Sequence, residues 1–253
     1  MSHIAITGGG RGIGLELARQ LEQLPTSRVA KVFVTTRGPS DELDKLIAKS
    51  AGRIVNIGCE VTDDASVEKA AAEIEAQLGG KGLDMLVNNV GTGVWTPDGV
   101  RSIDGATLLQ TFNVNVVSAH LVTAALIPAL QRGKEKKIIM MSSVLGSIGR
   151  ASQISWAKAP AYKITKAAMN MLSVQYAVTY EEEGFTVLAI YPGWLKTDLG
   201  TTNADLDVAQ GVSAALDLIL GADRKMNGKF YNIRVPGWEE VDGRAYDGAE
   251  IPW

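Results

Sequence analysis

The chain has 253 residues, with 25 Lys and Arg against 28 Asp and Glu. A composition of 46% hydrophobic and 21% charged residues is that of an ordinary globular protein, and it excludes intrinsic disorder and collagen-like sequence. The net charge of −3 gives no electrostatic footprint for nucleic acid or an anionic membrane. The single cysteine, Cys59, excludes an intrachain disulfide and fits a reducing compartment.

Short apolar, β-branched runs alternate with longer stretches of helical periodicity along the chain. Strands are predicted, in chain order, over residues 3–7, 31–36, 53–59, 83–89, 136–143, 185–193 and 229–233. Helices are predicted over residues 15–24, 41–50, 67–78, 104–132, 161–183 and 206–220. This alternation predicts an α/β fold with one doubly wound parallel sheet of about seven strands and helices on both faces, in one domain over residues 1–253. The glycine-rich last stretch, residues 237–253, is expected to fold back over the body.

The sequence shows no targeting or membrane signal. It does not open on a basic segment followed by an apolar stretch, and it contains no run of about 18 apolar residues. We therefore expect a cytoplasmic protein with neither a membrane nor a nucleic acid as partner. Only His3 and His120 accompany the one cysteine, so no metal site is expected.

A glycine-rich turn, TGGGRGIG over residues 7–14, joins the first strand to the first helix. Glycines let the backbone approach a pyrophosphate, and the helix N-terminus supplies N–H donors. The spacing of Gly8, Gly12 and Gly14 differs from the G-x-G-x-x-G of the common dinucleotide fingerprint, and a turn that serves only packing is the alternative. Its position between a strand and a helix favours a dinucleotide site.

The end of the second strand discriminates between cofactors. A carboxylate there would bind the adenosine ribose hydroxyls of NAD, but this chain has Thr35, Thr36 and Arg37 instead. Arg37 can pair with a 2′-phosphate, and Arg11 of the glycine turn can reach the same group. The pattern favours NADP(H), with two solvated surface arginines as the alternative.

Tyr162 and Lys166 form a Y-x-x-x-K pair that shares one face of a predicted helix. Ser143 follows the fifth strand, at the edge where ligands bind in open α/β sheets. NNVG at residues 88–91 ends the fourth strand, and Asn115 lies inside the helix after it.

Taken in this order, these motifs resemble those of the classical group of the short-chain dehydrogenase/reductase family, which has a Rossmann fold. The resemblance covers nearly the whole chain and includes PGWLKTD at residues 192–198. Within the family the chain is most similar to the subgroup of C-factor, the sniffer-type carbonyl reductases and the fungal norsolorinic-acid-type ketoreductases. The cues are TTR at residues 35–37, SSVLGSIG at 142–149 and the ending G-x-x-I-P-W.

The resemblance implies a catalytic role for each of four residues. Tyr162 would be the general acid for carbonyl reduction, with a pKa lowered by Lys166 and by the charge of oxidised nicotinamide. Lys166 would also hold the nicotinamide ribose, and Ser143 would orient the substrate oxygen. Asn115 resembles the asparagine that kinks this helix in the family and would hold a water that links Lys166 to solvent, although Asn113 lies only two positions away.

The resemblance also implies the cofactor contacts. They are Gly8, Arg11, Gly12, Ile13, Gly14, Arg37, Glu60, Val61, Asn89, Val90, Gly91, Tyr162, Lys166, Pro192, Gly193, Leu195 and Thr197. Glu60 stands where the family usually has Asp, and Val90 stands where it has Ala.

The substrate loops are expected at about residues 92–100, 146–160 and 194–206. Trp95, Trp156 and Trp194 lie in these loops, and they indicate either an aromatic-walled pocket for a bulky ketone or the packing of loops against the body. Arg150 or Lys196 would meet an acidic substrate group, unless both are solvated surface residues.

The predicted function is NADPH-dependent reduction of a small-molecule carbonyl compound, a bulky or aromatic ketone. The alternatives are an alcohol or steroid-type dehydrogenase acting in the oxidative direction, and a redox-inert NADP(H)-binding protein. A homo-oligomer, dimer or tetramer, is expected to form through the helices at residues 104–132 and 161–183, which pair subunits in many family members.

Overall fold

The computed structural model describes residues 1–240 and 245–253. Within them, seven parallel strands form one sheet in the order β3-β2-β1-β4-β5-β6-β7. The strands are β1 (Ser2–Thr7), β2 (Val29–Thr36), β3 (Ile54–Gly58), β4 (Met85–Asn88), β5 (Lys137–Met141), β6 (Thr186–Tyr191) and β7 (Lys229–Asn232). The order reverses between β1 and β4, where doubly wound sheets bind ligands. The predicted α/β fold class is confirmed.

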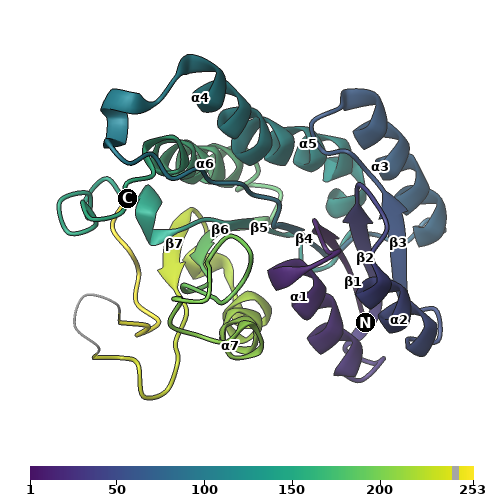
Figure 1. Ribbon diagram of the computed structural model, residues 1–253. Helices are drawn as coiled ribbons and strands as arrows, with labels where there is room; N and C mark the ends of the chain where they lie inside the picture. Colours follow the sequence, from purple (N-terminus) through teal and green to yellow (C-terminus); the bar gives the residue numbers. More distant parts are fainter. Residues whose placement is uncertain (241–244) are drawn as a thin grey trace.

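Helices cover both faces of the sheet (Figure 1). One face carries α1 (Gly12–Gln23), α2 (Asp41–Lys49) and α7 (Val208–Gly221). The other face carries α3 (Asp64–Leu78), α4 (Gly105–Phe112), α5 (Ser118–Gln131) and α6 (Pro160–Thr179). Short 3-10 turns lie at η1 (Gly99–Ser102), η3 (Val144–Gly146) and η4 (Arg224–Met226).

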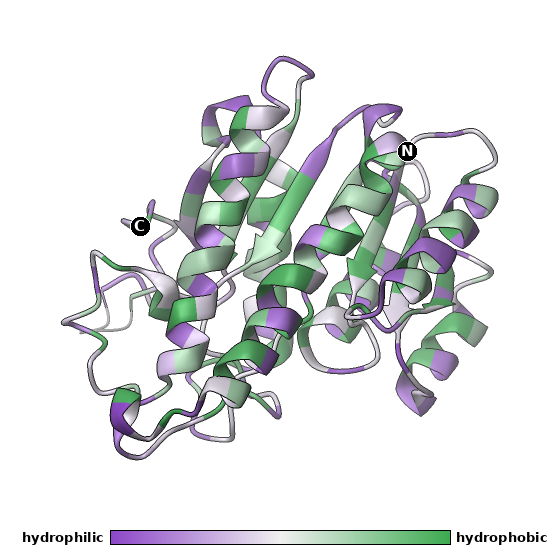
Figure 2. Ribbon diagram, turned by 90° about the horizontal axis from the view of Figure 1, so that it is seen from above, coloured by the Kyte–Doolittle hydropathy of each residue, from purple (hydrophilic) through white to green (hydrophobic). Residues whose placement is uncertain are grey.

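Side chains alternate between the two helical layers along each central strand. In β1, Ile4 and Ile6 pack on the α1–α7 side, and Ala5 packs on the α3–α5 side. Both faces are buried, so the strands read as continuous apolar runs rather than as alternating ones. Seen from above, hydrophobic residues run along the central strands and along the helices that lie over them (Figure 2).

Some predicted boundaries differ from the structure. The helix expected over residues 104–132 is divided by a π-helical turn, η2 (Asn113–Val117), between α4 and α5. The helix expected to reach residue 183 ends at Thr179, because the chain turns through residues 180–184 to enter β6. Helix α1 starts inside the glycine turn, at Gly12.

The segment Gly105–Gln131 is long and apolar enough, with a mean hydropathy of 1.5, to cross a membrane by length and composition. In the structure it packs against α3, α6 and β4, and 56% of its most apolar window is buried. Core helices pass the same test, and this packing explains the apolar composition of the segment.

The end of the chain folds back over the body, as expected, in the part that the structure describes. Ile251 is buried and donates its N–H to Phe230 O at 2.7 Å. Trp253 stacks on Phe230 and accepts a hydrogen bond from Gly149 N at 2.6 Å. The tail thereby contacts one of the expected substrate loops. Of this stretch, residues 241–244 lie outside the described residues.

Candidate active site

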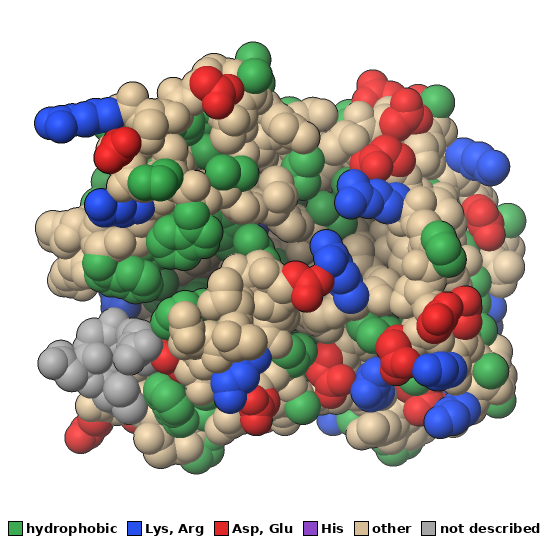
Figure 3. All heavy atoms as spheres, in the orientation of Figure 1, with side chains coloured by type: hydrophobic (Ala, Val, Ile, Leu, Met, Phe, Trp, Pro, Cys, Tyr) green, Lys and Arg blue, Asp and Glu red, His purple; other side chains and the backbone are tan. Residues whose placement is uncertain are grey.

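A cavity of about 630 Å³ opens at the carboxyl edge of the sheet. Its walls come from the ends of β4, β5 and β6, from the loops that follow them, and from α6. Figure 3 shows a hollow in this face of the molecule, with hydrophobic side chains gathered around it. Edges of this kind bind ligands in doubly wound folds.

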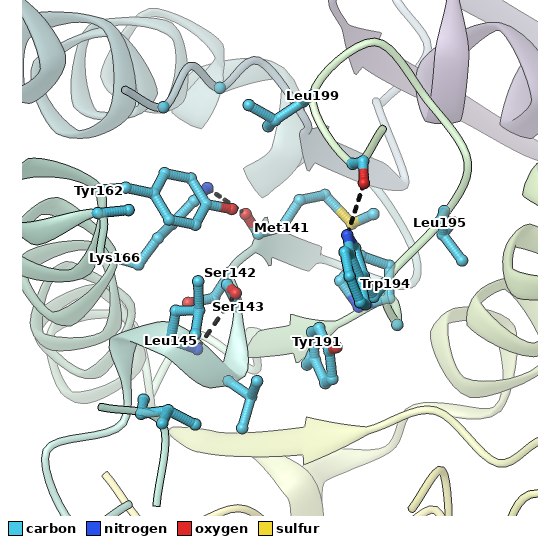
Figure 4. Close-up of a pocket in the computed structure, with 18 of the residues that line it drawn as sticks. Met141, Ser142, Ser143, Leu145, Tyr162, Lys166, Tyr191, Trp194, Leu195 and Leu199 are labelled. Atoms are coloured by element: carbon cyan, nitrogen blue, oxygen red, sulfur yellow. Dashed lines mark hydrogen bonds between the residues drawn. The ribbon is translucent and has the colours of Figure 1, made fainter. Parts of the chain in front are cut away.

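Ser143, Tyr162 and Lys166 all line this cavity (Figure 4). Ser143 lies two residues beyond β5, where its Oγ accepts a hydrogen bond from Leu145 N at 3.2 Å. Tyr162 and Lys166 lie one turn apart on α6, and Lys166 Nζ is 5.5 Å from the centre of the Tyr162 ring. The structure thus brings together the three residues that the sequence singled out.

Burial dominates the electrostatics of the pair. Lys166 is 3% exposed, its Nζ donates to Met141 O at 2.7 Å, and burial lowers its pKa to about 8. Burial raises the pKa of Tyr162 to about 12, and a hydrogen bond from Ser143 lowers it in part. Tyr162 therefore keeps its proton at neutral pH.

The expected fall in the pKa of Tyr162 is wrong for the chain's own residues. The prediction assumed an ammonium group on Lys166 while Tyr162 titrates. Lys166 loses its proton near pH 8, well below the pKa of about 12 of Tyr162, so it carries no charge at the pH where the phenol ionises. Desolvation then decides the direction of the shift.

Asn115 lies in the π-helical turn and is fully buried. Its Oδ1 accepts from Thr92 N at 2.8 Å, and its Nδ2 donates to Thr92 O and Thr165 Oγ1, each at 2.9 Å. A Cβ added to Gly91 would lie 3.4 Å from Lys166 Nζ and 3.6 Å from Asn115 Oδ1. Asn115 thus lies beside Lys166, whereas Asn113 is exposed. Such π-helical turns occur often at functional sites.

The glycine turn packs directly against the start of α1, where a side chain would not fit. A Cβ on Gly14 would lie 2.4 Å from Gly8 O, and the φ angles of Gly8 and Gly12 are +70° and +55°. Asn89 braces the turn, since its Nδ2 donates to Thr7 O at 2.9 Å and to Gly8 O at 3.2 Å. The first turn of α1 contains no acidic residue and receives no side-chain cap, so its N–H groups are available to an anion.

The two arginines expected near a 2′-phosphate differ in their surroundings. Arg37 is exposed directly after β2, and within the described residues no ion pair engages it. Arg11 forms an ion pair with Asp198, so its guanidinium connects the glycine turn to the loop after β6. Glu60 Oε1 accepts from Thr62 N and Oγ1, at 3.2 and 2.8 Å.

The remaining predicted residues divide into two groups. Those that line the cavity are Ile13, Asn89, Gly91, Pro192, Gly193, Leu195, Thr197 and the three tryptophans. Those that do not line it are Gly8, Arg11, Gly12, Gly14, Arg37, Glu60, Val61, Val90 and Asn115. Thr197 nevertheless approaches the glycine turn, because its Cγ2 lies 3.5 Å from a Cβ built on Gly12.

The three tryptophans belong to the wall of the cavity. The rings of Trp156 and Trp194 lie 6.3 Å apart at 43°, and Trp194 Nε1 donates to Gly200 O at 2.7 Å. Trp95 and Trp156 are about half exposed. Arg150 also lines the cavity, whereas Lys196 lies outside it and pairs with Asp207 at 2.8 Å.

Several polar residues of the cavity were not predicted from the sequence, among them Tyr191, Asn232 and Asp247. Tyr191 stands directly before Pro192 and Gly193, so its position in the sequence was a usable signal. Asn232 and Asp247 lie far along the chain, and the fold alone brings them to the cavity. In the described part of the chain no three His, Cys, Asp or Glu residues come together in a metal-binding group.

Residues 2–206 match the model of the family described as short chain dehydrogenase. The match covers most of the chain and agrees with the sheet order and the site geometry above. The chain therefore belongs to the short-chain dehydrogenase family of oxidoreductases, which confirms the resemblance found in its sequence.

Two known proteins are similar to this chain over most of its length. It is 30% identical over 172 residues to the C-signal of Myxococcus xanthus, covering 68% of this chain and 93% of that protein. It is 28% identical over 261 aligned positions to the short-chain dehydrogenase srdF of Neurospora crassa, covering 99% and 97%.

Two solved structures resemble the fold over its whole length. The NADPH-bound carbonyl reductase from chicken fatty liver has a TM-score of 0.88 and 30% identity, covering 100% of this chain and 99% of that one. The carbonyl reductase Sniffer of D. melanogaster has a TM-score of 0.86 and 28% identity, covering 100% of both chains.

Proposed function

We propose that this protein reduces a ketone to an alcohol, with NADPH as the hydride donor and Tyr162 as the proton donor. The observation that carries the proposal is the meeting of Ser143, Tyr162 and Lys166 in one cavity, on the sheet edge that also holds the glycine turn. The chicken carbonyl reductase, which is similar over its whole length, was solved with NADPH bound.

The residues present fit a nicotinamide dinucleotide phosphate. The lack of a Cβ at Gly14 lets α1 begin in direct contact with the glycine turn, and the uncapped N-terminus of α1 favours the charge of a pyrophosphate. Arg37 follows β2 without a carboxylate beside it, which suits a 2′-phosphate. When bound, the cofactor supplies the hydride, and the chain supplies binding, orientation and the proton.

The protein's own residues orient the substrate, donate the proton and stabilise the charge that remains. Ser143 donates a hydrogen bond to the substrate oxygen and orients it, and the Tyr162 hydroxyl gives its proton to that oxygen as the alcohol forms. Below pH 8 the Lys166 ammonium, 5.5 Å from the Tyr162 ring centre, stabilises the phenolate left behind. Asn115 fixes the π-helical turn and Thr92 beside Lys166, where a water can relay the returning proton.

The cavity favours a bulky aromatic ketone. The three tryptophans supply flat apolar walls, and the volume of about 630 Å³ is shared between the substrate and the nicotinamide end of the cofactor. The loops at residues 92–100, 146–160 and 194–206 each contribute a tryptophan to that wall. This arrangement supports one catalytic domain whose loops select the substrate.

The proposal extends to assembly and location. Apolar side chains of α4 and α6 are exposed, among them Leu109, Met171 and Val178. These faces suit a homo-oligomer, dimer or tetramer, whose formation size-exclusion chromatography with light scattering tests. We also propose that the enzyme works in the cytoplasm, where its single thiol, the buried Cys59, remains reduced.

The test is consumption of NADPH, followed by its absorbance, against a panel from small diketones to quinones and polycyclic aromatic ketones. The expected result is turnover that prefers NADPH to NADH and improves with aromatic bulk. Turnover only of alcohols with NADP⁺ would instead indicate the oxidative direction. Tight NADPH binding without turnover of any substrate would indicate a redox-inert protein.

A further inference from the structure

A second tyrosine, Tyr191, faces the cavity and has no role in the reaction described above. It ends β6, directly before Pro192, and pairs in register with Asn232 of β7. Figure 4 shows its ring near Trp194, with Ser143 and Leu145 nearby at the cavity. A substrate whose carbonyl oxygen meets Ser143 and Tyr162 thus has Tyr191 within reach of its ring.

The hydroxyl of Tyr246, which lies behind Tyr191, already makes hydrogen bonds within the protein. Tyr246 is completely buried, and its OH donates to Asp205 Oδ2 at 2.7 Å. The same oxygen accepts the N–H of Trp194 at 3.1 Å. A phenol has one proton and a carboxylate only accepts, so the proton of Tyr246 belongs to Asp205.

Because the Tyr246 proton is donated to Asp205, the direction of the hydrogen bond between Tyr246 and Tyr191 is fixed. The rings of Tyr191 and Tyr246 lie 6.0 Å apart, and their hydroxyl groups interact through a hydrogen bond. Tyr246 has no proton left to give, so Tyr191 is the donor. The Tyr191 oxygen then offers only lone pairs to the cavity. Burial, together with Tyr246 and Asp205, raises the pKa of Tyr191 far above its usual range, so the phenol stays protonated.

We propose that Tyr191 is a specificity-determining residue that accepts a hydrogen bond from a hydroxyl group on the ketone substrate. The enzyme then prefers a hydroxylated aromatic ketone to its deoxy or methoxy counterpart. This inference rests on the proposed function, because Ser143 and Tyr162 set the position of the carbonyl group.

Two other groups on this wall could also accept a hydroxyl, the Asn232 side-chain oxygen and the Asp247 carboxylate. Asn232 Nδ2 donates to Ala245 O at 2.7 Å and to Asp247 Oδ1 at 3.2 Å, but Asn232 Oδ1 is buried without a hydrogen-bond partner among the described residues. Loss of the hydroxyl preference in Tyr191→Phe separates recognition by Tyr191 from recognition by these two groups. Arg150 also lines the cavity, but a guanidinium only donates and would bind the oxygen of a methoxy group. A comparison of hydroxyl and methoxy substituents therefore separates recognition by Tyr191 from recognition by Arg150.

The experiment compares three sets of bicyclic aryl ketones: α-tetralone itself, the tetralones with a phenolic hydroxyl at each free ring position in turn, and the matching methoxy compounds. One neutral hydrogen bond corresponds to about 1 kcal/mol, so we expect the best hydroxylated ketone to exceed α-tetralone about five- to tenfold in kcat/KM. The methoxy compound should fall to or below the level of α-tetralone.

Three variants, each lacking one tyrosine hydroxyl, test which hydroxyl group recognises the substrate. In Tyr191→Phe the ratio of hydroxylated to deoxy kcat/KM should fall to about 1. In Tyr246→Phe the Tyr191 proton is released and can donate, so the methoxy compound should gain relative to the hydroxylated one. Tyr180→Phe removes a hydroxyl from a tyrosine stacked on Tyr176, away from the cavity, and should leave the ratios unchanged.

A wild-type enzyme without preference for a hydroxyl at any ring position would overturn the inference. So would a methoxy compound equal to the hydroxylated one, or a preference that survives in Tyr191→Phe. Failure of the proposed function looks different, because then no tetralone is reduced. In that case the dissociation constants of the same ketones, measured by titration of the full chain, still compare hydroxyl with methoxy. If a variant fails to fold, the wild-type comparison decides.

Discussion

Lys166→Met should make the protein more stable while it removes activity. The pKa of Lys166 drops from 10.5 to about 8 because the buried site disfavours the ammonium ion. One pKa unit corresponds to about 1.4 kcal/mol, so at pH 7 the buried charge costs about 3 kcal/mol of folding free energy. The lost hydrogen bond to Met141 O offsets about 1 kcal/mol, which leaves the variant about 2 kcal/mol more stable.

The sign of the pH dependence follows from the same shift. Between pH 8 and 10.5 the unfolded chain binds more protons at Lys166 than the folded chain does, so the stability of the wild type rises with pH there. The cost is fully present below pH 8 and is nearly gone at pH 10. The advantage of Lys166→Met should therefore fall to about zero kcal/mol between pH 7 and pH 10.

The assay is urea unfolding at pH 7 and pH 10, followed by tryptophan fluorescence. Lys225→Met is the matched control, since Lys225 is exposed, and its stability should stay within about 0.5 kcal/mol of the wild type at both pH values. A Lys166→Met variant that is less stable than the wild type at pH 7 would refute the reasoning. An advantage of equal size at both pH values would refute it as well.

Three further variants test other parts of the site. Gly14→Ala places a Cβ 2.4 Å from Gly8 O and should weaken NADPH binding at least about tenfold by titration, whereas Gly38→Ala meets nothing within 4 Å and should bind normally. Arg37→Asp should raise the Kd of NADPH about 10- to 100-fold and spare that of NADH; an equal loss for both cofactors would contradict a contact with the 2′-phosphate. Trp156→Ala should raise the KM of a polycyclic ketone several-fold and leave that of a small diketone alone, unless this tryptophan only packs the loop.

The strands were predictable because a doubly covered sheet demands continuous apolar runs. In β5 and β6 nearly every side chain is buried, and these runs stand out in the sequence. The apolar periodicity continues through residues 113–117 and gives no sign of the π-helical turn, so only the resemblance of Asn115 to the family's helix-kinking asparagine predicted a distortion there. Its cause lies in tertiary contacts, where Asn115 binds Thr92 and Thr165.

The catalytic trio was predictable from spacing and from the strand edge, but its electrostatics were not. The direction of the shift at Tyr162 depends on burial of both Tyr162 and Lys166, which no local sequence feature encodes. The polar residues of the cavity wall could not be predicted from the sequence for a similar reason. Tyr246 reaches Tyr191 only because the end of the chain folds back along β7.

The most direct test of the account is the rate of NADPH consumption by Tyr162→Phe with the best ketone of the panel, beside the wild type and Tyr180→Phe. Phe keeps the ring and removes only the proton donor, so kcat should fall about a hundredfold or more while NADPH binding persists. Tyr180→Phe should retain the wild-type rate. A Tyr162→Phe variant that turns over at the wild-type rate would contradict the central claim that Tyr162 gives the proton.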